Sequence, residues 1–371
     1  MKTGTLLHIG LIGPLPAPAG GMANQTAQLR RLLELAGHTV DMVRSNAPYR
    51  PLWSGRIPLL RAAVRLLPYL WRLWRTAGRV QVLHVMANSG WSWHLVAAPA
   101  IWIARWRGCP VVINYRGGEA ERFLRQAKAW IAPSLRQASL VVPSAYLAEV
   151  FSRHGFGSVI VPNVIDLQRF APGRQPRNAA PTVLLARHLE PIYDIGTALR
   201  AFALVRHQHP LAQMVVAGDG PERGRLQTLA AQLGLAGAVE FAGHLDHAAM
   251  AQRYLAADIA LNASLADNMP NSILEALASG VAVVSTRVGG VPHLVQHGCQ
   301  ALLVPPADPD AMAAAMLRLI AEPALARQLR ANGLLLVRQY AWEQVQPAWM
   351  AAYRQAREAG RVAAPAAGEQ A

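Results

Sequence analysis

The chain has 371 residues, of which 53% are hydrophobic and 15% charged, and its formal net charge is +15. This much apolar material and this little charge exclude a disordered chain, and the length favours two α/β domains over one. The longest apolar stretches are broken by proline and are shorter than the roughly 20 residues that span a bilayer, so we predict no transmembrane helix.

The N-terminal half alternates strand-like and helix-like patterns. Thr5–Gly13 is apolar, and a glycine-rich loop at Gly20 and Gly21 then opens a helical pattern that ends near Leu35. Met1–Gly13 also resembles a secretory signal, but its apolar run is short and contains a histidine, so we interpret it as a buried first strand. Further strands are expected at 80–86, 110–115 and 140–142, and further helices at 92–107 and 120–132.

Positive charge is concentrated in this half, where residues 1–170 hold 20 Lys and Arg against 6 Asp and Glu. In segment 56–79, a helical period of about 100° per residue brings five arginines to within roughly 40° of one direction. Leucines and tryptophans flank this stripe, which is typical of a kinked helix on an anionic membrane surface; an ordinary amphipathic helix is the alternative. The five are Arg61, Arg65, Arg72, Arg75 and Arg79.

The second half repeats the alternation after a Pro- and Arg-rich linker. Six short apolar runs with helical segments between them predict a second doubly wound parallel sheet. The expected organisation is an N-terminal Rossmann-like domain at 1–168, a linker at 169–181, a C-terminal Rossmann-like domain at 182–345, a helix at 346–359 that packs back toward the first domain and a disordered tail at 360–371.

The segment Asp267–Ala276 carries the clearest chemical signal. It follows a buried strand and leads into a helix that begins near Asn271, so it lies at the carboxyl edge of the sheet, where open α/β sheets bind ligands. The helix N-terminus offers free N–H groups to a diphosphate. Glu275 can accept hydrogen bonds from a ribose diol, and Asp267 can reach sugar hydroxyls; a helix cap with a solvated glutamate is the alternative.

The wider chain resembles glycosyltransferase family 4, whose members are retaining enzymes. The resemblance rests on the order and spacing of several short motifs. These are Gly20-Gly21, Val161–Asp166, Arg187, Ala217–Pro221, Ala257–Ile259, the pair Asp267 and Glu275, and Thr286–Pro292. It implies an α/β fold of the GT-B type, in which two Rossmann-like doubly wound parallel-sheet domains face a cleft.

The resemblance also implies roles for individual residues. Arg187 would face the donor diphosphate, Glu275 would bind the donor ribose, and Asp267 would take the first acidic place of a pair that in the family is more often Glu. Gly20 and Gly21 would let the N-terminal loop approach the donor sugar. The remaining donor-binding candidates are Asn268, Met269, Pro270, Asn271 and Ser272 on the loop, and Gly243, His244 and Leu245 at the nucleobase, where a structural turn is an equal alternative.

Two positions depart from the family pattern. The lysine that usually follows the arginine by five or six residues is missing, and Ile192-Tyr193-Asp194 occupies the stretch, so Arg116, Arg287 or the helix dipole would compensate. A histidine common after the fourth strand is also absent. Arg116 or Glu119 is the candidate for the reaction centre there, with a structural glycine-rich turn as the alternative.

The resemblance implies an acceptor-binding first domain, a donor-binding second domain and a transferase that moves a sugar from a UDP- or GDP-linked donor to a glycan or lipid-linked acceptor, in polysaccharide or glycolipid synthesis. No cofactor, catalytic metal or nucleic acid is expected. Two distant cysteines without metal-ligand spacing favour a reducing compartment, so we expect a cytoplasmic protein, peripheral on the inner membrane. A nucleotide-sugar epimerase, a sugar phosphorylase, a catalytically weakened relative and a basic nucleic-acid-binding protein are the alternatives.

Overall fold

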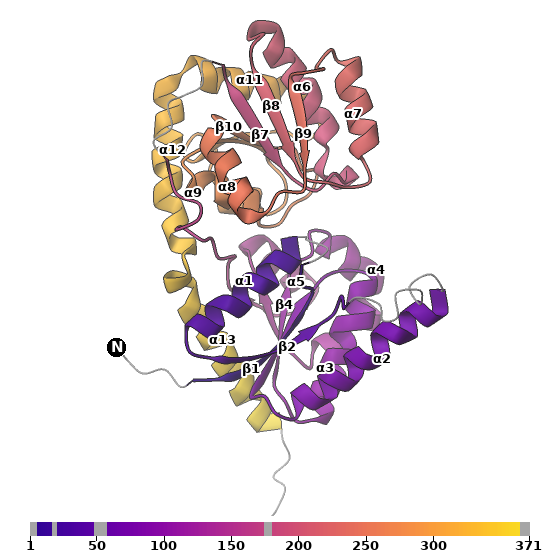
Figure 1. The fold of residues 1–371 in the computed structure, drawn as a ribbon. Coiled ribbons are helices and arrows are strands. Elements are labelled where there is room, and N and C mark those ends of the chain that lie inside the picture. Colours follow the sequence, from indigo (N-terminus) through magenta and orange to yellow (C-terminus); the bar gives the residue numbers. More distant parts are fainter. Residues whose placement is uncertain (1–5, 17–20, 48–57, 174–179, 364–371) are drawn as a thin grey trace, which may run out of the picture. The chain divides into compact units, whose positions relative to one another are not determined.

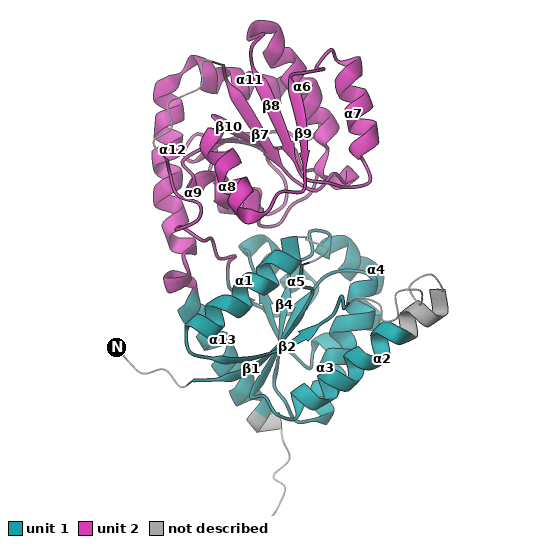
Figure 2. Cartoon of the chain, viewed as in Figure 1, with its two compact units in different colours: residues 1–161, 346–371 teal, residues 162–345 magenta. Residues whose placement is uncertain are grey.

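The computed structural model describes residues 6–16, 21–47, 58–173 and 180–363, and the side chains of 58–63 and 361–363 are not described. The chain divides into two compact units, one of residues 1–161 with 346–371 and one of residues 162–345 (Figure 2). Each unit is built around one parallel sheet.

The first unit contains a six-stranded sheet in the order β2-β1-β3-β4-β5-β6; strands β1, β2 and β4 of this sheet are labelled in Figure 1. Its central strands are near-continuous apolar runs, as expected where a parallel sheet is covered on both faces. The elements are β1 (His8–Gly13), α1 (Gly21–Leu35), β2 (Thr39–Arg44), α2 (Pro58–Ala77), β3 (Val82–Ala87), a π-helical turn at Trp93–Ala97, α3 (Ala98–Trp106), β4 (Val111–Tyr115), α4 (Ala120–Leu135), β5 (Ser139–Val142), α5 (Ala145–Arg153) and β6 (Val159–Ile160).

The second unit repeats the plan with a six-stranded sheet in the order β12-β11-β10-β7-β8-β9. Its elements are β7 (Thr182–Ala186), a 3-10 turn at Pro191–Tyr193, α6 (Ile195–Gln208), β8 (Gln213–Ala217), α7 (Arg223–Gln232), β9 (Val239–Gly243), α8 (His247–Ala256), β10 (Ile259–Asn262), α9 (Asn271–Ala278), β11 (Ala282–Thr286), α10 (Val291–Leu294), β12 (Ala301–Val304), α11 (Pro309–Ala321), α12 (Pro323–Val337) and a 3-10 turn at Arg338–Tyr340. The last helix, α13 (Trp342–Ala363), begins in this unit and from residue 346 onward belongs to the first one.

Alternate side chains of strands in the second sheet enter separate cores. On β7, Val183 and Leu185 join a core formed with α6, α7 and α11, whereas Leu184 between them joins the core of α8 and α9. This alternation follows from the period of two along a strand. It confirms the predicted doubly wound sheets with helices on both faces.

The final helix, α13, covers part of the first sheet. Trp349 and Tyr353 are buried, and both rings contact His84 of β3. The helix continues to Ala363, so the prediction that it ends at residue 359 was wrong by four residues; residues 364–371 of the predicted tail lie outside the described residues. No helix in the described part of the chain is long and apolar enough to cross a membrane.

Two strands were not predicted from the sequence. β2 reads Thr-Val-Asp-Met-Val-Arg and is only partly buried, because it is the edge strand beside β1. β6 contains two residues, Val159 and Ile160. Neither one forms the continuous apolar run by which the other strands were recognised.

Candidate functional site

A partly buried ion pair lies at the carboxyl edge of the second sheet. Arg187 follows β7, and its guanidinium pairs with the carboxylate of Asp267; the two side chains are 13% and 12% exposed. Nε of Arg187 also donates to Oδ1 of Asn262, at the end of the neighbouring strand β10, at 3.1 Å. The Asp267 carboxylate accepts from Oγ of Ser264 at 3.2 Å and from the Asn268 backbone N–H at 2.9 Å. These contacts hold the Arg187 guanidinium in one place.

Tyr193 occupies the stretch in which the family lysine is missing. Its ring lies beneath the Arg187 guanidinium, 4.9 Å from ring centroid to Cζ, within the range of a cation–π contact. The next residue, Asp194, has φ of 40° and caps α6, where its carboxylate accepts from the Thr197 hydroxyl at 2.7 Å. Arg287, one suggested substitute, is exposed after β11.

The loop before α9 is held by close backbone packing. A Cβ atom on Gly290 would lie 1.9 Å from the Asn268 carbonyl oxygen, and one on Gly289 would lie 2.0 Å from that of Asp267. The Gly290 N–H donates to the Asp267 carbonyl at 2.9 Å. The glycines of the Thr286–Pro292 motif therefore allow one loop to pack against the other.

Asn163, from the Val161–Asp166 motif, braces the same loop. Its side-chain amide donates to the Met269 carbonyl at 2.9 Å and to Oδ1 of Asn271 at 2.7 Å. Pro270, at the N-cap of α9, provides no side-chain acceptor for the first N–H groups of the helix. The helix N-terminus keeps the donors that suit an anion.

Glu275 lies one turn into α9 and is half-buried. Burial raises the pKa of its carboxyl group to about 7, although a hydrogen bond with Tyr254 and the positive charge of Arg187 oppose this rise. The Tyr254 hydroxyl, which comes from α8, also lies 3.1 Å from the Ser272 carbonyl oxygen. Glu275, Tyr254 and Arg187 thus influence one another electrostatically.

The other predicted donor residues vary in exposure. Asn268, Met269 and Pro270 are buried, with Met269 packed in the core, whereas Asn271 and Ser272 are partly exposed. At the end of β9, Gly243 has φ of 69°, and its carbonyl oxygen accepts a hydrogen bond from the Gly218 backbone N–H at 2.8 Å. His244 is exposed, and Leu245 packs partly against the core.

In the first unit, Arg116 follows β4 and is partly buried. Nε of Arg116 donates to Oδ1 of Asn114 at 3.2 Å, and another guanidinium nitrogen donates to Oε1 of Gln25 on α1. Burial lowers the pKa of Arg116 to about 9. The Asn114 amide nitrogen lies 3.1 Å from Nε2 of His84, whose Nδ1 lies 2.8 Å from the Tyr353 hydroxyl. A hydrogen-bonded chain therefore runs from Arg116 to α13.

The other candidates of the first unit lie apart from this chain. Glu119 is exposed and pairs with Arg122 at 3.4 Å. Gly21 begins α1 with open space at its Cβ position, and Gly20 lies outside the described residues. A Cβ on Gly117 would lie 2.5 Å from Oδ1 of Asn88, so packing explains part of the glycine-rich turn.

Five site residues were not singled out from the sequence: Asn163, Tyr193, Tyr254, Asn262 and Ser264. Asn262 and Ser264 had a usable signal, because a polar residue at the end of a buried strand marks the carboxyl edge of the sheet. Tyr254 lies on a helix without such a signal. Among the described residues, no group of three or more His, Cys, Asp and Glu side chains is arranged to hold a metal ion.

Both halves of the chain match known families. The family model described as Glycosyltransferase Family 4 matches residues 19–169, and the one described as Glycosyl transferases group 1 matches residues 180–322.

Curated relatives differ in how much of their length the chain covers. A phosphatidyl-myo-inositol mannosyltransferase of Mycolicibacterium smegmatis is 25% identical over 378 residues, or 95% of each chain. A glycogen synthase of Mycobacterium tuberculosis is 29% identical over 286 residues, or 73% of this chain and 69% of the relative. An exopolysaccharide phosphotransferase of Streptomyces coelicolor is 33% identical over 220 residues, which are 57% of this chain and 22% of that relative.

Solved structures share the fold at lower identity. A sucrose-phosphate synthase from Thermosynechococcus elongatus has a TM-score of 0.75 and 24% identity, covering 95% of this chain and 100% of that one. HepE of Anabaena, in complex with UDP and glucose, has a TM-score of 0.71 and 19% identity, covering 95% and 99%. These likenesses confirm the GT-B fold class.

Proposed function

Because the chain belongs to the glycosyltransferases of family 4, we propose that it is a retaining hexosyltransferase that uses a nucleotide diphosphate sugar, linked to UDP or GDP, as its donor. The observation that carries this proposal is the fixed position of Arg187 at the sheet edge where α9 begins, with Glu275 one turn into that helix. A cation, an uncapped helix N-terminus and a carboxylate are the groups needed for a diphosphate and a ribose.

Catalysis follows from the charge that develops on the leaving group. Breaking the bond between sugar and phosphate leaves negative charge on the diphosphate, and groups already in position stabilise it without reorganisation. Arg187 and the first N–H groups of α9 take this role. Asp267 and Tyr193 hold the guanidinium in place, and Asp267 meets the sugar hydroxyls once the donor enters.

Retention requires the acceptor to attack from the face that the diphosphate leaves. In the proposed reaction, the acceptor oxygen bonds to the anomeric carbon as the sugar–phosphate bond breaks, and the acceptor proton passes to a diphosphate oxygen. No pair of carboxylates with the roles found in glycosidases is required. An inverted anomeric configuration in the product would rule out this mechanism.

Arg116 is our candidate for the reaction centre in the first unit, with Glu119 as the alternative. The hydrogen-bonded chain through Asn114 and His84 fixes the Arg116 guanidinium from behind. Asn114 donates to Nε2 of His84, so the neutral ring carries its proton on Nδ1 and donates to Tyr353. A guanidinium held in this way can stabilise developing negative charge without reorganising.

The proposed acceptor is a glycan or a lipid-linked sugar, in polysaccharide or glycolipid synthesis. The names of the relatives support this choice, because they include a phosphatidyl-myo-inositol mannosyltransferase and a glycogen synthase. The helix α2 provides a basic surface on which such a substrate can be met at a membrane. Arg72 and Arg75 are exposed on this helix, and Arg79 is exposed two residues after its end. Arg65 donates to the Ala47 carbonyl at 3.2 Å, and the side chain of Arg61 lies outside the described residues.

The first experiment is a panel of UDP-, GDP- and ADP-linked sugars, tested for stabilisation on heating and for slow donor hydrolysis. One donor is expected to bind, and Glu275→Ala and Arg187→Ala are each expected to lower kcat/KM by at least about tenfold, or roughly 1.4 kcal/mol. Arg327→Ala, on exposed surface of the same unit, is the matched control. Wild-type rates in both site variants would contradict the site, and conversion of the donor into a second nucleotide sugar without acceptor would indicate an epimerase.

Membrane docking is tested separately by vesicle flotation. The protein is expected to float with vesicles that contain anionic lipid and to remain behind with neutral vesicles. Replacing Arg72, Arg75 and Arg79 by Gln is expected to reduce flotation. No flotation of the wild-type protein, or an unchanged level in the triple variant, would reject docking through α2 while leaving the donor site untouched.

A further inference from the structure

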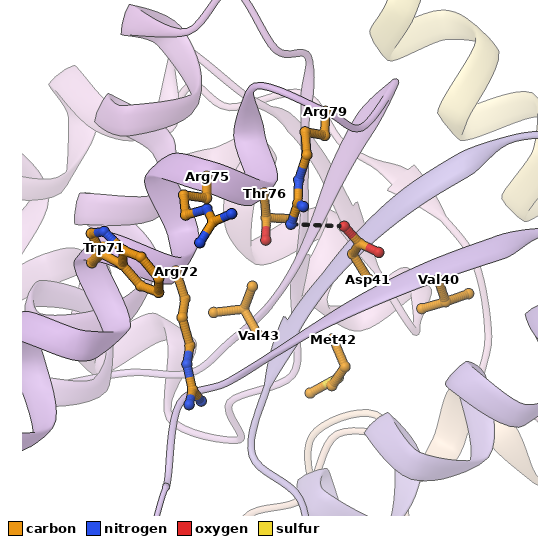
Figure 3. Close-up of a pocket in the computed structure, with 9 residues that line it drawn as sticks. All are labelled: Val40, Asp41, Met42, Val43, Trp71, Arg72, Arg75, Thr76 and Arg79. Carbon is orange, nitrogen blue, oxygen red and sulfur yellow. Dashed lines mark ion pairs between the residues drawn. The ribbon is translucent and has the colours of Figure 1, made fainter.

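A pocket opens between α2 and the edge strand β2 (Figure 3). Its volume is about 390 Å³, which lies within the range of roughly 300–1,000 Å³ of small-molecule sites. In the sheet, β1 and β3 separate it from β4, which places β2 about 14 Å from β4 at the usual strand spacing. The pocket is therefore distinct from Arg116 after β4. It is lined by Val40, Asp41, Met42, Val43, Trp71, Arg72, Arg75, Thr76 and Arg79.

The charge of the pocket is predominantly positive. Three arginines line it against one carboxylate, that of Asp41. Asp41 is already engaged, because it lies 3.6 Å from a guanidinium nitrogen of Arg79 and 3.1 Å from Nε2 of His8. Residues 42–118 contain no Asp or Glu, so this segment of the chain provides no carboxylate that would compete with a bound anion for the arginines.

An apolar surface adjoins the arginines on the same helix. Leu67, Trp71 and Trp74 are spaced by four and three residues, so they share one face of α2, and their exposed fractions are 66%, 58% and 44%. The Arg75 guanidinium lies 4.8 Å from the ring centroid of Trp71, and that of Arg107 lies 5.0 Å from the ring centroid of Trp74. Exposed aromatic side chains beside arginines are the composition of a helix that lies in a membrane interface.

We propose that this pocket binds the phosphate headgroup of an anionic phospholipid, so that docking recognises phosphate as well as negative surface charge. Guanidinium groups present paired N–H donors that match the oxygens of a phosphate group. We expect the carboxylate of a lipid without phosphate to fit these donors less well. Trp71 lines the pocket together with the arginines and shares a face of α2 with the exposed Leu67 and Trp74, so a headgroup can enter the pocket while these apolar side chains contact the acyl region. This inference rests on the proposed membrane docking and names the chemistry that the docking surface selects.

The test compares the full-length protein on three kinds of vesicle: phosphatidylcholine alone, phosphatidylcholine with phosphatidylglycerol, and phosphatidylcholine with a carboxylate lipid at equal surface charge. The wild-type protein is expected to bind the phosphatidylglycerol vesicles at least about tenfold more tightly than the carboxylate vesicles, a difference of about 1.4 kcal/mol. Arg75→Lys with Arg79→Lys keeps the charge but loses the paired donors. This variant is expected to retain binding to both anionic vesicles and to lose the preference between them.

A matched control is Arg31→Gln with Arg125→Gln, which removes two charges from exposed positions of the same unit outside the pocket. It is expected to keep the preference for phosphate, whereas Arg75→Gln with Arg79→Gln loses it. The proposed phosphate site would be wrong, but membrane docking would stand, if the wild-type protein bound both anionic vesicles equally well. The same conclusion would follow if the Arg31→Gln, Arg125→Gln control lost the preference for phosphate as fully as the Arg75→Gln, Arg79→Gln variant. No binding to either would overturn both. If free inorganic phosphate displaced the protein from vesicles with the same affinity as the headgroup, the assignment to a lipid would be overturned. Nucleotide-sugar binding is measured on every variant and reports the donor site independently.

Discussion

The affinity for the donor is expected to depend on the ionisation of Glu275. The pKa of this carboxyl group is raised to about 7, mainly by burial, and only the ionised form accepts two strong hydrogen bonds from a ribose diol. The ionised fraction is then about 9% at pH 6 and about 91% at pH 8, so the Kd of a nucleotide sugar should fall about tenfold over this range, or about 1.4 kcal/mol. A glutamate with a pKa of about 4.3 would give almost no change.

The same pKa shift has a consequence for folding. The carboxyl group stays protonated in the folded protein while the unfolded chain ionises near the ordinary value of 4.5. The folded state therefore binds more protons between this value and about 7, and the free energy of unfolding should fall as pH rises through that window. Donor binding is expected to favour the ionised carboxylate of Glu275 and therefore to lower the pKa of this group in the folded protein.

The assay is calorimetric titration of the identified nucleotide sugar at several pH values. A nucleotide sugar is preferable to the free nucleotide, because a terminal phosphate itself titrates near pH 6. Glu275→Gln should bind more weakly and without this pH dependence. Glu240→Gln is the matched control, since Glu240 is exposed on β9 and pairs with Arg253 at 2.5 Å, and it should keep the tenfold change.

Two results would refute this reasoning. A wild-type affinity that is constant between pH 6 and 8 would mean that the carboxyl group is ionised throughout, or that it does not bind the ribose. An undiminished pH dependence in Glu275→Gln would assign the titration to a group other than this carboxyl.

Three further predictions follow from single contacts. Tyr254→Phe removes a hydrogen bond that lowers the pKa of Glu275, so the midpoint of donor binding should move above pH 7, and an unchanged midpoint would exclude the contact. Gly290→Ala places a Cβ atom against the Asn268 carbonyl oxygen, 1.9 Å away without adjustment, and should displace the donor loop and weaken donor binding at least about tenfold, measured by the same titration. Burial lowers the pKa of His84 to about 3 in the folded protein. As pH falls below about 6.5, the imidazole of His84 is therefore protonated in the unfolded chain but not in the folded one. The free energy of unfolding should consequently fall by up to about 1.4 kcal/mol per pH unit. Urea unfolding of His84→Gln between pH 7 and 5 should show a shallower dependence, and an equal slope would reject the assignment.

The sequence by itself predicted much of the fold. Strands such as Thr182–Ala186 and Gln213–Ala217 were located to the residue, because a strand buried on both faces must be apolar along its whole length. The edge strand Thr39–Arg44 was missed, since one of its faces is partly solvated and its pattern is mixed. The alternation of strands and helices also indicated the sheet edge at which the candidate donor-binding segment Asp267–Ala276 lies.

Only the tertiary structure decided which groups meet at that edge. Arg187 and Asp267 pair across 80 residues of chain, Asn163 reaches a loop 106 residues away, and His84 meets Tyr353 across 269 residues. Periodicity reports whether a side chain faces the core or the solvent, but it carries no information about the partner on another element. That choice depends on strand order and on close packing, and for this reason Tyr193 beneath the Arg187 guanidinium could be found only in the folded chain.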